Sequence, residues 1–177
     1  MAARLPYDLS CSRLRELGLL AHDDHAPMPK RLPQFDDEEP LGFNVFRTHL
    51  SEALDLSDLS LPRTFFGRSE INRVSFRNTD LHESNLCWND FLETDFTGAD
   101  LARSDMRSSL FKRVMFVNTN LDGADLRRSS LVDCDFEGAT MKGVALTQEQ
   151  GTTIHLSETQ RHDIDWRVDI GPEPDGG

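Results

Sequence analysis

The sequence is poor in cysteine, tyrosine and long apolar runs. Its three cysteines, an odd number without a CxxC pair, argue against a disulfide framework or a structural zinc site. No run of about 18 apolar residues is present, so a membrane-spanning helix is not expected. The first ten residues lack the apolar core of a signal peptide, and the chain is therefore expected in the cytoplasm.

Basic residues are scarce relative to acidic ones. The sequence has 19 Lys and Arg against 31 Asp and Glu, a formal net charge of −12. Contacts with nucleic acid phosphates or anionic membranes need a basic surface, so direct binding to either is not expected. Basic partners, or protein sites that normally hold DNA, are compatible with this charge.

The length and the apolar content indicate one domain with a thin core. A chain of 177 residues is long enough for one main body with short appendages. Only 37% of the residues are hydrophobic, yet eleven of them are Phe. A repeat fold that concentrates these residues along a narrow axis reconciles the two facts.

Large apolar residues recur at every fifth position from residue 66 to residue 146. The series comprises Phe66, Ile71, Phe76, Leu81, Leu86, Phe91, Phe96, Leu101, Met106, Phe111, Phe116, Leu121, Leu126, Leu131, Phe136, Met141 and Leu146. The residue two positions before each of them is nearly always small. Neither a helical period of 3.6 nor a strand period of 2 gives this spacing. A chain that turns a corner every five residues does.

Units such as residues 99–103 (Ala-Asp-Leu-Ala-Arg) and 124–128 (Ala-Asp-Leu-Arg-Arg) resemble the pentapeptide-repeat family, whose consensus is Ala-Asp/Asn-Leu-X-X. The resemblance covers residues 64–148. It implies an all-β repeat fold, a right-handed four-sided β-helix with twenty residues in each coil. About four coils are then expected, with a short helical N-terminal cap and a C-terminal helix plus strand.

The twenty-residue period is also visible in the residues themselves, because like residues recur on the same side. We expect the core to contain two such columns, Phe76, Phe96, Phe116 and Phe136 beside Leu81, Leu101, Leu121 and Met141. Asn89 occupies a small inward position, where it needs internal hydrogen-bond partners. Leu110 replaces the usual Asp or Asn and is a candidate for exposed contact surface.

The chain divides into three segments. Residues 1–63 are expected to be a helical and loop cap, with one helix opening at Ser10 or Ser12 and another at Asn44. Between them, residues 22–40 are rich in proline and acidic residues, and form either an extended connector or a recognition motif. Residues 64–148 are the β-helix, and residues 149–177 are a second cap that ends in a loose tail.

The C-terminal segment predicts a helix followed by a strand. Ser157 and Gln160 have the spacing of a capping box, which favours a helix over residues 158–163. The alternation of Ile164, Trp166, Val168 and Ile170 with polar residues is typical of a half-buried strand. This strand pairs either within the chain or with its twin in a second copy, so a homodimer joined by these four residues is one expectation. The resemblance supports it, because the family includes such dimers.

No constellation of residues calls for catalysis, a cofactor or a metal. The six histidines are scattered, and only His22 and His25 have a spacing that resembles ligand spacing. The aspartates of the β-helix stand just before the large residues, where the repeat itself explains them. We therefore expect a protein that is not an enzyme.

The charges of the repeat segment are unevenly distributed. Two sides of the expected coil carry seven acids against three basic residues, and include Asp95, Asp100, Asp135 and Glu137. The other two sides carry seven basic residues against six acids. They place Trp88 near Arg68, Arg107 and Arg127, a combination enriched in protein interfaces.

Two hypotheses for function follow, both without catalysis. The family includes proteins that bind DNA gyrase or topoisomerase IV by imitating duplex DNA, and the acidic side is the candidate for such a surface. The alternative is an adaptor or immunity-type protein whose Trp88 face binds and neutralises another protein, such as a toxin. Both place the binding residues on the outside of the β-helix.

Overall fold

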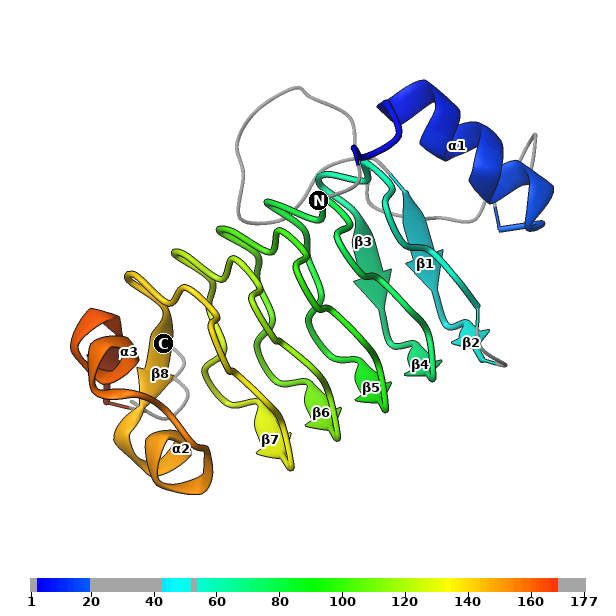
Figure 1. Cartoon of the computed structure of the whole chain (residues 1–177). Helices are drawn as coiled ribbons and strands as arrows, with labels where there is room; N and C mark the ends of the chain where they lie inside the picture. The colour runs from blue at the N-terminus through cyan, green and yellow to red at the C-terminus, as the bar shows by residue number, and fades with distance from the viewer. Residues whose placement is uncertain (1–2, 20–42, 52–53, 169–177) are drawn as a thin grey trace, which may run out of the picture.

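The protein is a β-solenoid of about six turns in the computed structural model (Figure 1). The structure describes residues 3–19, 43–51 and 54–168. The pentapeptide β-helix predicted from the sequence is confirmed, although it has more coils than the four expected. The predicted loop at 22–40, including His22 and His25, and the predicted tail at 171–177 lie outside the described residues.

Four ladders of parallel pairing make the four sides of the solenoid. The longest carries β1 (Asn44–Phe46), β3 (Phe65–Gly67), β8 (Ala145–Thr147) and β9 (Asp165–Arg167), joined through single-residue bridges at positions 85, 105 and 125. The second is the sheet of β2 (His49–Leu50), β4 (Glu70–Asn72), β5 (Asp90–Leu92), β6 (Leu110–Lys112) and β7 (Ser130–Val132). Bridges at steps of twenty residues form the other two sides, from Asp55 to Asp135 and from Ser60 to Thr140.

The solenoid begins about twenty residues earlier than the sequence predicted. The helix expected from Asn44 is wrong, because β1 and β2 occupy this segment and pair in parallel with β3 and β4. The inward residues of this first coil include Val45, Leu50 and Leu56, all buried. Leu50 and Leu56 are six residues apart, and this single extra residue breaks the five-residue period by which the coil could have been recognised.

The core consists of stacked side chains that repeat from coil to coil. The rings of Phe76, Phe96, Phe116 and Phe136 lie 5.1, 5.5 and 5.0 Å apart between centroids and are close to parallel. Leu81, Leu101, Leu121 and Met141 form the neighbouring column, each no more than 1% exposed. Each fully buried Leu or Phe side chain contributes about 1.5–3 kcal/mol, so these columns are a major source of stability.

Small polar residues form a second, internal ladder. In most coils an inward hydroxyl donates a hydrogen bond to the carbonyl of the large residue 23 positions earlier, as Ser109 Oγ does to Leu86 O at 2.8 Å. Asn89 joins this ladder fully: its Nδ2 donates to Phe66 O and Cys87 O, both at 2.8 Å, and its Oδ1 accepts from Ser69 N. Asn89 is therefore buried at little cost, because its amide is satisfied.

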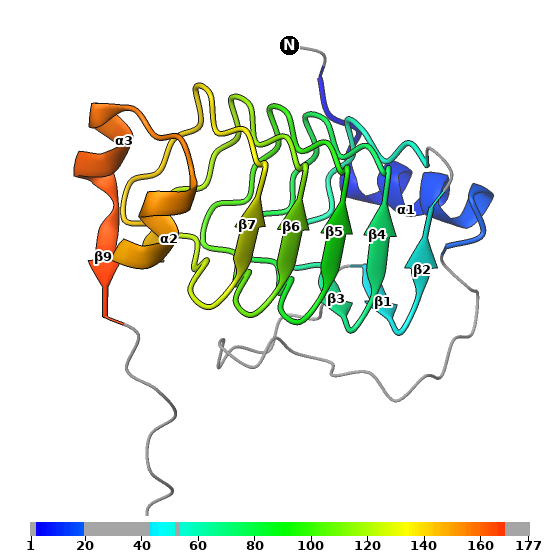
Figure 2. The same ribbon diagram turned by 90° about the horizontal axis from the view of Figure 1, so that it is seen from below.

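Two helices close the C-terminal end by continuing this internal ladder. The side chains of Gln150 in α2 (Gln148–Thr153) and Gln160 in α3 (Glu158–Asp163) each complete a capping box. Their Nε2 atoms also donate to Leu126 O and Phe136 O at 2.7 Å, where the repeat would have placed a hydroxyl. The predicted helix over residues 158–163 is thus present, and with α2 it replaces two sides of the last coil (Figure 2).

The predicted C-terminal strand pairs within the chain. β9 lies parallel to β8, with Trp166 opposite Leu146. Ile164 is buried, and the Nε1 atom of Trp166 donates to Arg161 O at 3.0 Å. Val168 is 81% exposed, and Ile170 lies outside the described residues.

The N-terminal helix α1 (Tyr7–Glu16) lies against the first coil. It begins before the expected Ser10 or Ser12, after Pro6, and it ends at Glu16. The Oγ atom of Ser10 accepts a hydrogen bond from Ser60 N and donates to Leu5 O, while Leu14 is fully buried in the core. This helix therefore covers apolar surface that the open end of the solenoid would expose.

Candidate protein-binding surface

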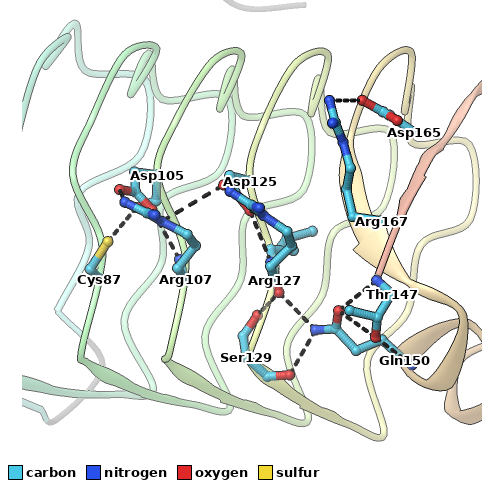
Figure 3. A network of polar contacts seen from close by, with 11 residues as sticks. Cys87, Asp105, Arg107, Asp125, Arg127, Ser129, Thr147, Gln150, Asp165 and Arg167 are labelled. Atoms are coloured by element: carbon cyan, nitrogen blue, oxygen red, sulfur yellow. Dashed lines mark hydrogen bonds and ion pairs between the residues drawn. The ribbon is translucent and has the colours of Figure 1, made fainter. Parts of the chain in front are cut away.

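A ladder of ion pairs runs along the side of the solenoid that carries β3 and β8 (Figure 3). Arg107 donates to both carboxylate oxygens of Asp105, at 2.8 and 2.6 Å. Arg127 makes the same contact with Asp125 one coil further, and Arg167 pairs with Asp165. The Asp-x-Arg spacing explains the first two pairs, because the Oδ1 atoms of Asp105 and Asp125 also accept a hydrogen bond from the backbone N–H of the arginine two residues later and so hold the pair together at the turn.

These pairs neutralise much of the predicted basic side. The Asp105 side chain is 8% exposed, and its burial acts to raise its pKa. Hydrogen bonds from Arg107 outweigh that effect and hold the pKa of Asp105 below its ordinary value. The same bonds raise the pKa of Arg107. Arg107 and Arg127 therefore carry their charge beside a carboxylate.

Three aromatic side chains gather at the N-terminal end of this ladder. Phe46 and Phe65 lie on adjacent strands with ring centroids 6.5 Å apart and an interplanar angle of 27°. Trp88 stands at the next corner with 69% of its surface exposed. Together with Arg68 and Arg107 they line a pocket of about 410 Å³. We call these five residues the aromatic–arginine patch.

Gly67 allows the two phenylalanine rings to lie close to the backbone. A Cβ atom at this position would stand 2.8 Å from the ring of Phe65 and 2.9 Å from that of Phe46. Such distances are well inside van der Waals contact, so any larger residue would push the rings outward. Buried Asn85 and Asp105 also line the pocket.

The sequence identified only part of the aromatic–arginine patch. It placed Trp88 near Arg68 and Arg107, and the structure brings these three to one pocket. Arg127 lies outside the pocket, one coil further along the solenoid, where it pairs with Asp125. Phe46 was missed because its segment was assigned to a helix. Phe65 carried a usable signal, since it occupies the position before the large residue, where Asp or Asn is usual.

The predicted acidic residues do not form one continuous surface. Asp95 pairs with Arg77 at 2.8 Å, and Asp100 accepts a hydrogen bond from Asn120. Met115, 41% exposed, stands between Asp95 and Asp135 on their ladder. Asp135 and Glu137 lie at the C-terminal end, lining a pocket of about 460 Å³ beside α3. The acidic side is thus partly neutralised and interrupted.

Arginine and glutamate residues also balance each other at the corners. Glu93 accepts hydrogen bonds from Arg113 and Arg73, which lower its pKa. Glu83 pairs in the same way with Arg103 at 2.7 Å. Like charges on successive coils would repel across one strand spacing, roughly 4.8 Å. Alternating charges at the corners therefore allow the coils to stack.

The described residues contain no evident metal site or catalytic thiol. Within residues 3–19, 43–51 and 54–168, no cluster of three or more His, Cys, Asp or Glu side chains is placed to hold a metal ion. Burial is the main cause that raises the pKa of Cys134 to about 11, and it also raises that of Cys87. A catalytic thiol needs the opposite shift. Among the same residues, no helix is long and apolar enough to cross a membrane.

The four ladders and the twenty-residue coil agree with a comparison of the sequence with family models. The model described as "Pentapeptide repeats (8 copies)" matches residues 109–148. The resemblance to the pentapeptide-repeat family that the sequence predicted is thus confirmed by the family model over these residues. No curated protein matches its sequence.

Solved pentapeptide-repeat structures have the same fold. One is Rfr23 from the cyanobacterium Cyanothece 51142, which is 20% identical, with 55% of this chain and 80% of that chain covered and a TM-score of 0.53. Another is HetL from Nostoc sp. strain PCC 7120, described as involved in heterocyst differentiation regulation. It is 17% identical, with 65% of this chain and 50% of that chain covered and a TM-score of 0.50. At these identities the likeness concerns the fold alone.

Proposed function

We propose that this pentapeptide-repeat protein is a non-catalytic scaffold that binds another protein through the aromatic–arginine patch. The observation that carries the proposal is Trp88, a large aromatic side chain that is 69% exposed beside a pocket. Trp and Arg are the residues most enriched at the energetic centres of protein interfaces. An adaptor or immunity-type protein, whose target is another protein such as a toxin, needs a surface of this kind.

The charges of the solenoid support this site over the acidic side. The carboxylates of Asp95 and Glu83, on the acidic side, face arginines within the chain, so an incoming basic partner would have to compete with them. Arg68, in contrast, is exposed and has no ion pair in the described part of the chain. A partner can therefore reach an uncompensated charge and an apolar surface at one place.

An affinity pull-down from the source cell tests the proposal. Wild type is compared with Trp88→Asn, which suits the left-handed backbone at this corner because Asn78 and Asn118 have the same conformation at equivalent corners. Asp95→Lys is the control on the other side. A protein recovered with wild type and Asp95→Lys, and lost with Trp88→Asn, is the expected result. Equal recovery with all three would contradict it.

A modulator of DNA gyrase or topoisomerase IV that imitates DNA is the second candidate. Asp133, Asp135 and Glu137 favour it, because they cluster near the C-terminal end without an ion pair in the described residues. Supercoiling and decatenation assays with the purified protein test this function. We expect any effect to vanish in Asp135→Lys/Glu137→Lys and to persist in Trp88→Asn. No effect of wild type at micromolar concentration would exclude this candidate.

We also propose a homodimer through the C-terminal segment. β9 uses one edge for β8, and Val168 is exposed at its end. The edge opposite β8 offers backbone groups for a second copy. Light scattering after size exclusion should give twice the mass of the chain, and Val168→Asp should shift it to that of one chain. A single-chain mass for wild type would refute the dimer.

A further inference from the structure

We infer that the pocket of the aromatic–arginine patch takes an acidic protein segment in which a large apolar side chain stands next to Asp or Glu. This inference rests on the proposed function and specifies the chemistry of the partner. It is carried by three features of the pocket: its apolar surface, its unpaired positive charge and its size.

The apolar surface is unusual for the exterior of this solenoid. Phe46 and Phe65 point outward from β1 and β3, while their neighbours Val45 and Phe66 point into the core. Asn85, Asp105 and Asp125 occupy the position of Phe65 in the following coils, and Gly67 is the residue paired with Phe46. Neither phenylalanine ring fills the interior of the coil, so both rings can form the wall of a site. Partly buried rings beside an exposed Trp provide surface that an apolar side chain can desolvate.

The charge of the pocket selects an acidic partner. Arg68 lines the pocket, and the guanidinium of Arg47 lies 5.1 Å from the centre of the Phe46 ring. Neither arginine forms an ion pair within the described residues, whereas Arg107 is engaged by Asp105. An arriving carboxylate therefore finds the guanidinium of Arg68 in the pocket, which can donate to it in the bidentate geometry that arginine favours, with the positive charge of Arg47 beside the Phe46 wall. A basic segment would be repelled by the same charges.

The net charge of the chain excludes the other large anion, a nucleic acid. Its formal charge of −12 repels a long polyphosphate, which must contact a wide surface and not one pocket. The pocket volume of about 410 Å³ lies near the lower end of the range for ligand sites. It therefore suits one apolar side chain with its flanking residues.

Selection from a random dodecapeptide phage library on the immobilised full-length protein tests the inference. We expect the enriched sequences to carry an aromatic or large aliphatic residue beside Asp or Glu. The affinity of the synthetic peptides, measured by fluorescence anisotropy, should fall at least tenfold in Trp88→Asn and in Arg68→Glu. The second change is compatible with its corner, because Glu83 and Glu93 have the same positive φ at equivalent positions.

Lys142→Glu is the matched control, since it makes the same kind of charge reversal at an exposed position outside the pocket. It should leave the peptide affinity unchanged, and circular dichroism should show that all three variants are folded. Enrichment of basic peptides, no enrichment, or affinity retained in Trp88→Asn and Arg68→Glu would each overturn the inference. If the cellular pull-down still depends on Trp88 in that case, the scaffold function stands and only the partner chemistry is wrong.

Discussion

The corners of the solenoid place ordinary residues in a backbone conformation that favours glycine. The residue two positions after each large inward residue from Phe66 to Met141 has a positive φ, between 50° and 60° where it is not glycine, as for Ser108 at 56°. For an L-residue this conformation costs about 1–2 kcal/mol. The stack tolerates this cost because most corners also form a hydrogen bond to the next coil, such as Ser108 N to Arg127 O.

Replacing Ser108 by glycine should therefore stabilise the protein. The relief of strain exceeds the entropy that glycine loses on folding, so we expect a gain of about 0.5–1 kcal/mol and a rise in Tm of about 2–4 °C. Thermal unfolding followed by circular dichroism measures it. Gly98→Ala, at a φ of +69° with only Asn78 N within 4 Å, should lower Tm instead. A fall in Tm for Ser108→Gly would show that its side chain makes a needed contact.

The Asp105–Arg107 pair should make stability depend on pH. The pKa of Asp105 is lowered in the folded state, so the stabilisation is complete above its unfolded value of about 4 and is lost as pH falls through the folded value. Asp105→Asn removes this contribution, about 2 kcal/mol for hydrogen bonds to a charged group. Urea unfolding should show a large difference from wild type at pH 7 and a smaller one at pH 3.

Asp90→Asn is the control for that series, because Asp90 is exposed in β5 and forms no ion pair in the described residues. Its difference from wild type should stay small at both pH values. A penalty for Asp105→Asn that is the same at pH 7 and pH 3 would mean that the charge of Asp105 contributes nothing.

At the scale of elements, two glutamines, Gln150 and Gln160, hold the C-terminal helices in place. Each of them completes the capping box of its helix and also donates hydrogen bonds to carbonyls of the preceding coil. The Oε1 atom of Gln160 accepts a hydrogen bond from Ser157 N, while its Nε2 donates to Phe136 O and Ala139 O. Gln160→Glu keeps the acceptor and removes both donors, leaving two buried carbonyls opposite a carboxylate. We expect a loss of about 2–4 kcal/mol in urea unfolding.

Ser157→Ala distinguishes the capping interaction at the start of α3 from the hydrogen bonds that Gln160 donates to the coil. It removes the side-chain cap of α3, at a cost of about 1 kcal/mol, and leaves the Nε2 contacts with the coil. Should Gln160→Glu cost no more than Ser157→Ala, the link between the helix and the solenoid would carry no stability.

Elements whose period is regular were predictable from sequence, and those that depend on one irregular residue were not. The five-residue recurrence of large side chains was sufficient to predict the coil, because it reflects a packing constraint repeated in every turn. The first coil was missed because of the extra residue between Leu50 and Leu56. α3 followed from its capping box, but the contact of Gln160 with the preceding coil required the three-dimensional structure.

The aromatic–arginine patch was harder to predict than the fold for a related reason. Trp88 and Arg68 could be placed together, since a twenty-residue coil fixes their columns. Phe46 joins them only because the first coil begins earlier. The positive charge that Arg107 and Arg127 offer to a partner was overestimated. A count of charged residues on one side of the coil does not show that the aspartate two residues before each arginine pairs with it.

At the scale of the whole molecule, the two ends decide whether a solenoid remains a discrete particle. Each coil pairs with the next through parallel backbone hydrogen bonds, so an uncovered end is a template for another chain. At the C-terminal end, β9 covers β8, and α2 and α3 satisfy carbonyls of the preceding coil. Figure 2 shows these elements across the end of the coil stack.

Truncation after Thr147 removes this cover and should convert the protein into larger assemblies. The edge of β8 and the apolar residues of the last coil, including Met141 and Leu146, then face solvent, and they match the surface of another uncapped coil. Light scattering after size exclusion should give assemblies larger than those of the full-length protein, with a mass that grows with concentration. A truncated chain that stays at the mass of a single copy would mean that the coil stack ends without help from its helices, and that α2, α3 and β9 are present for another purpose.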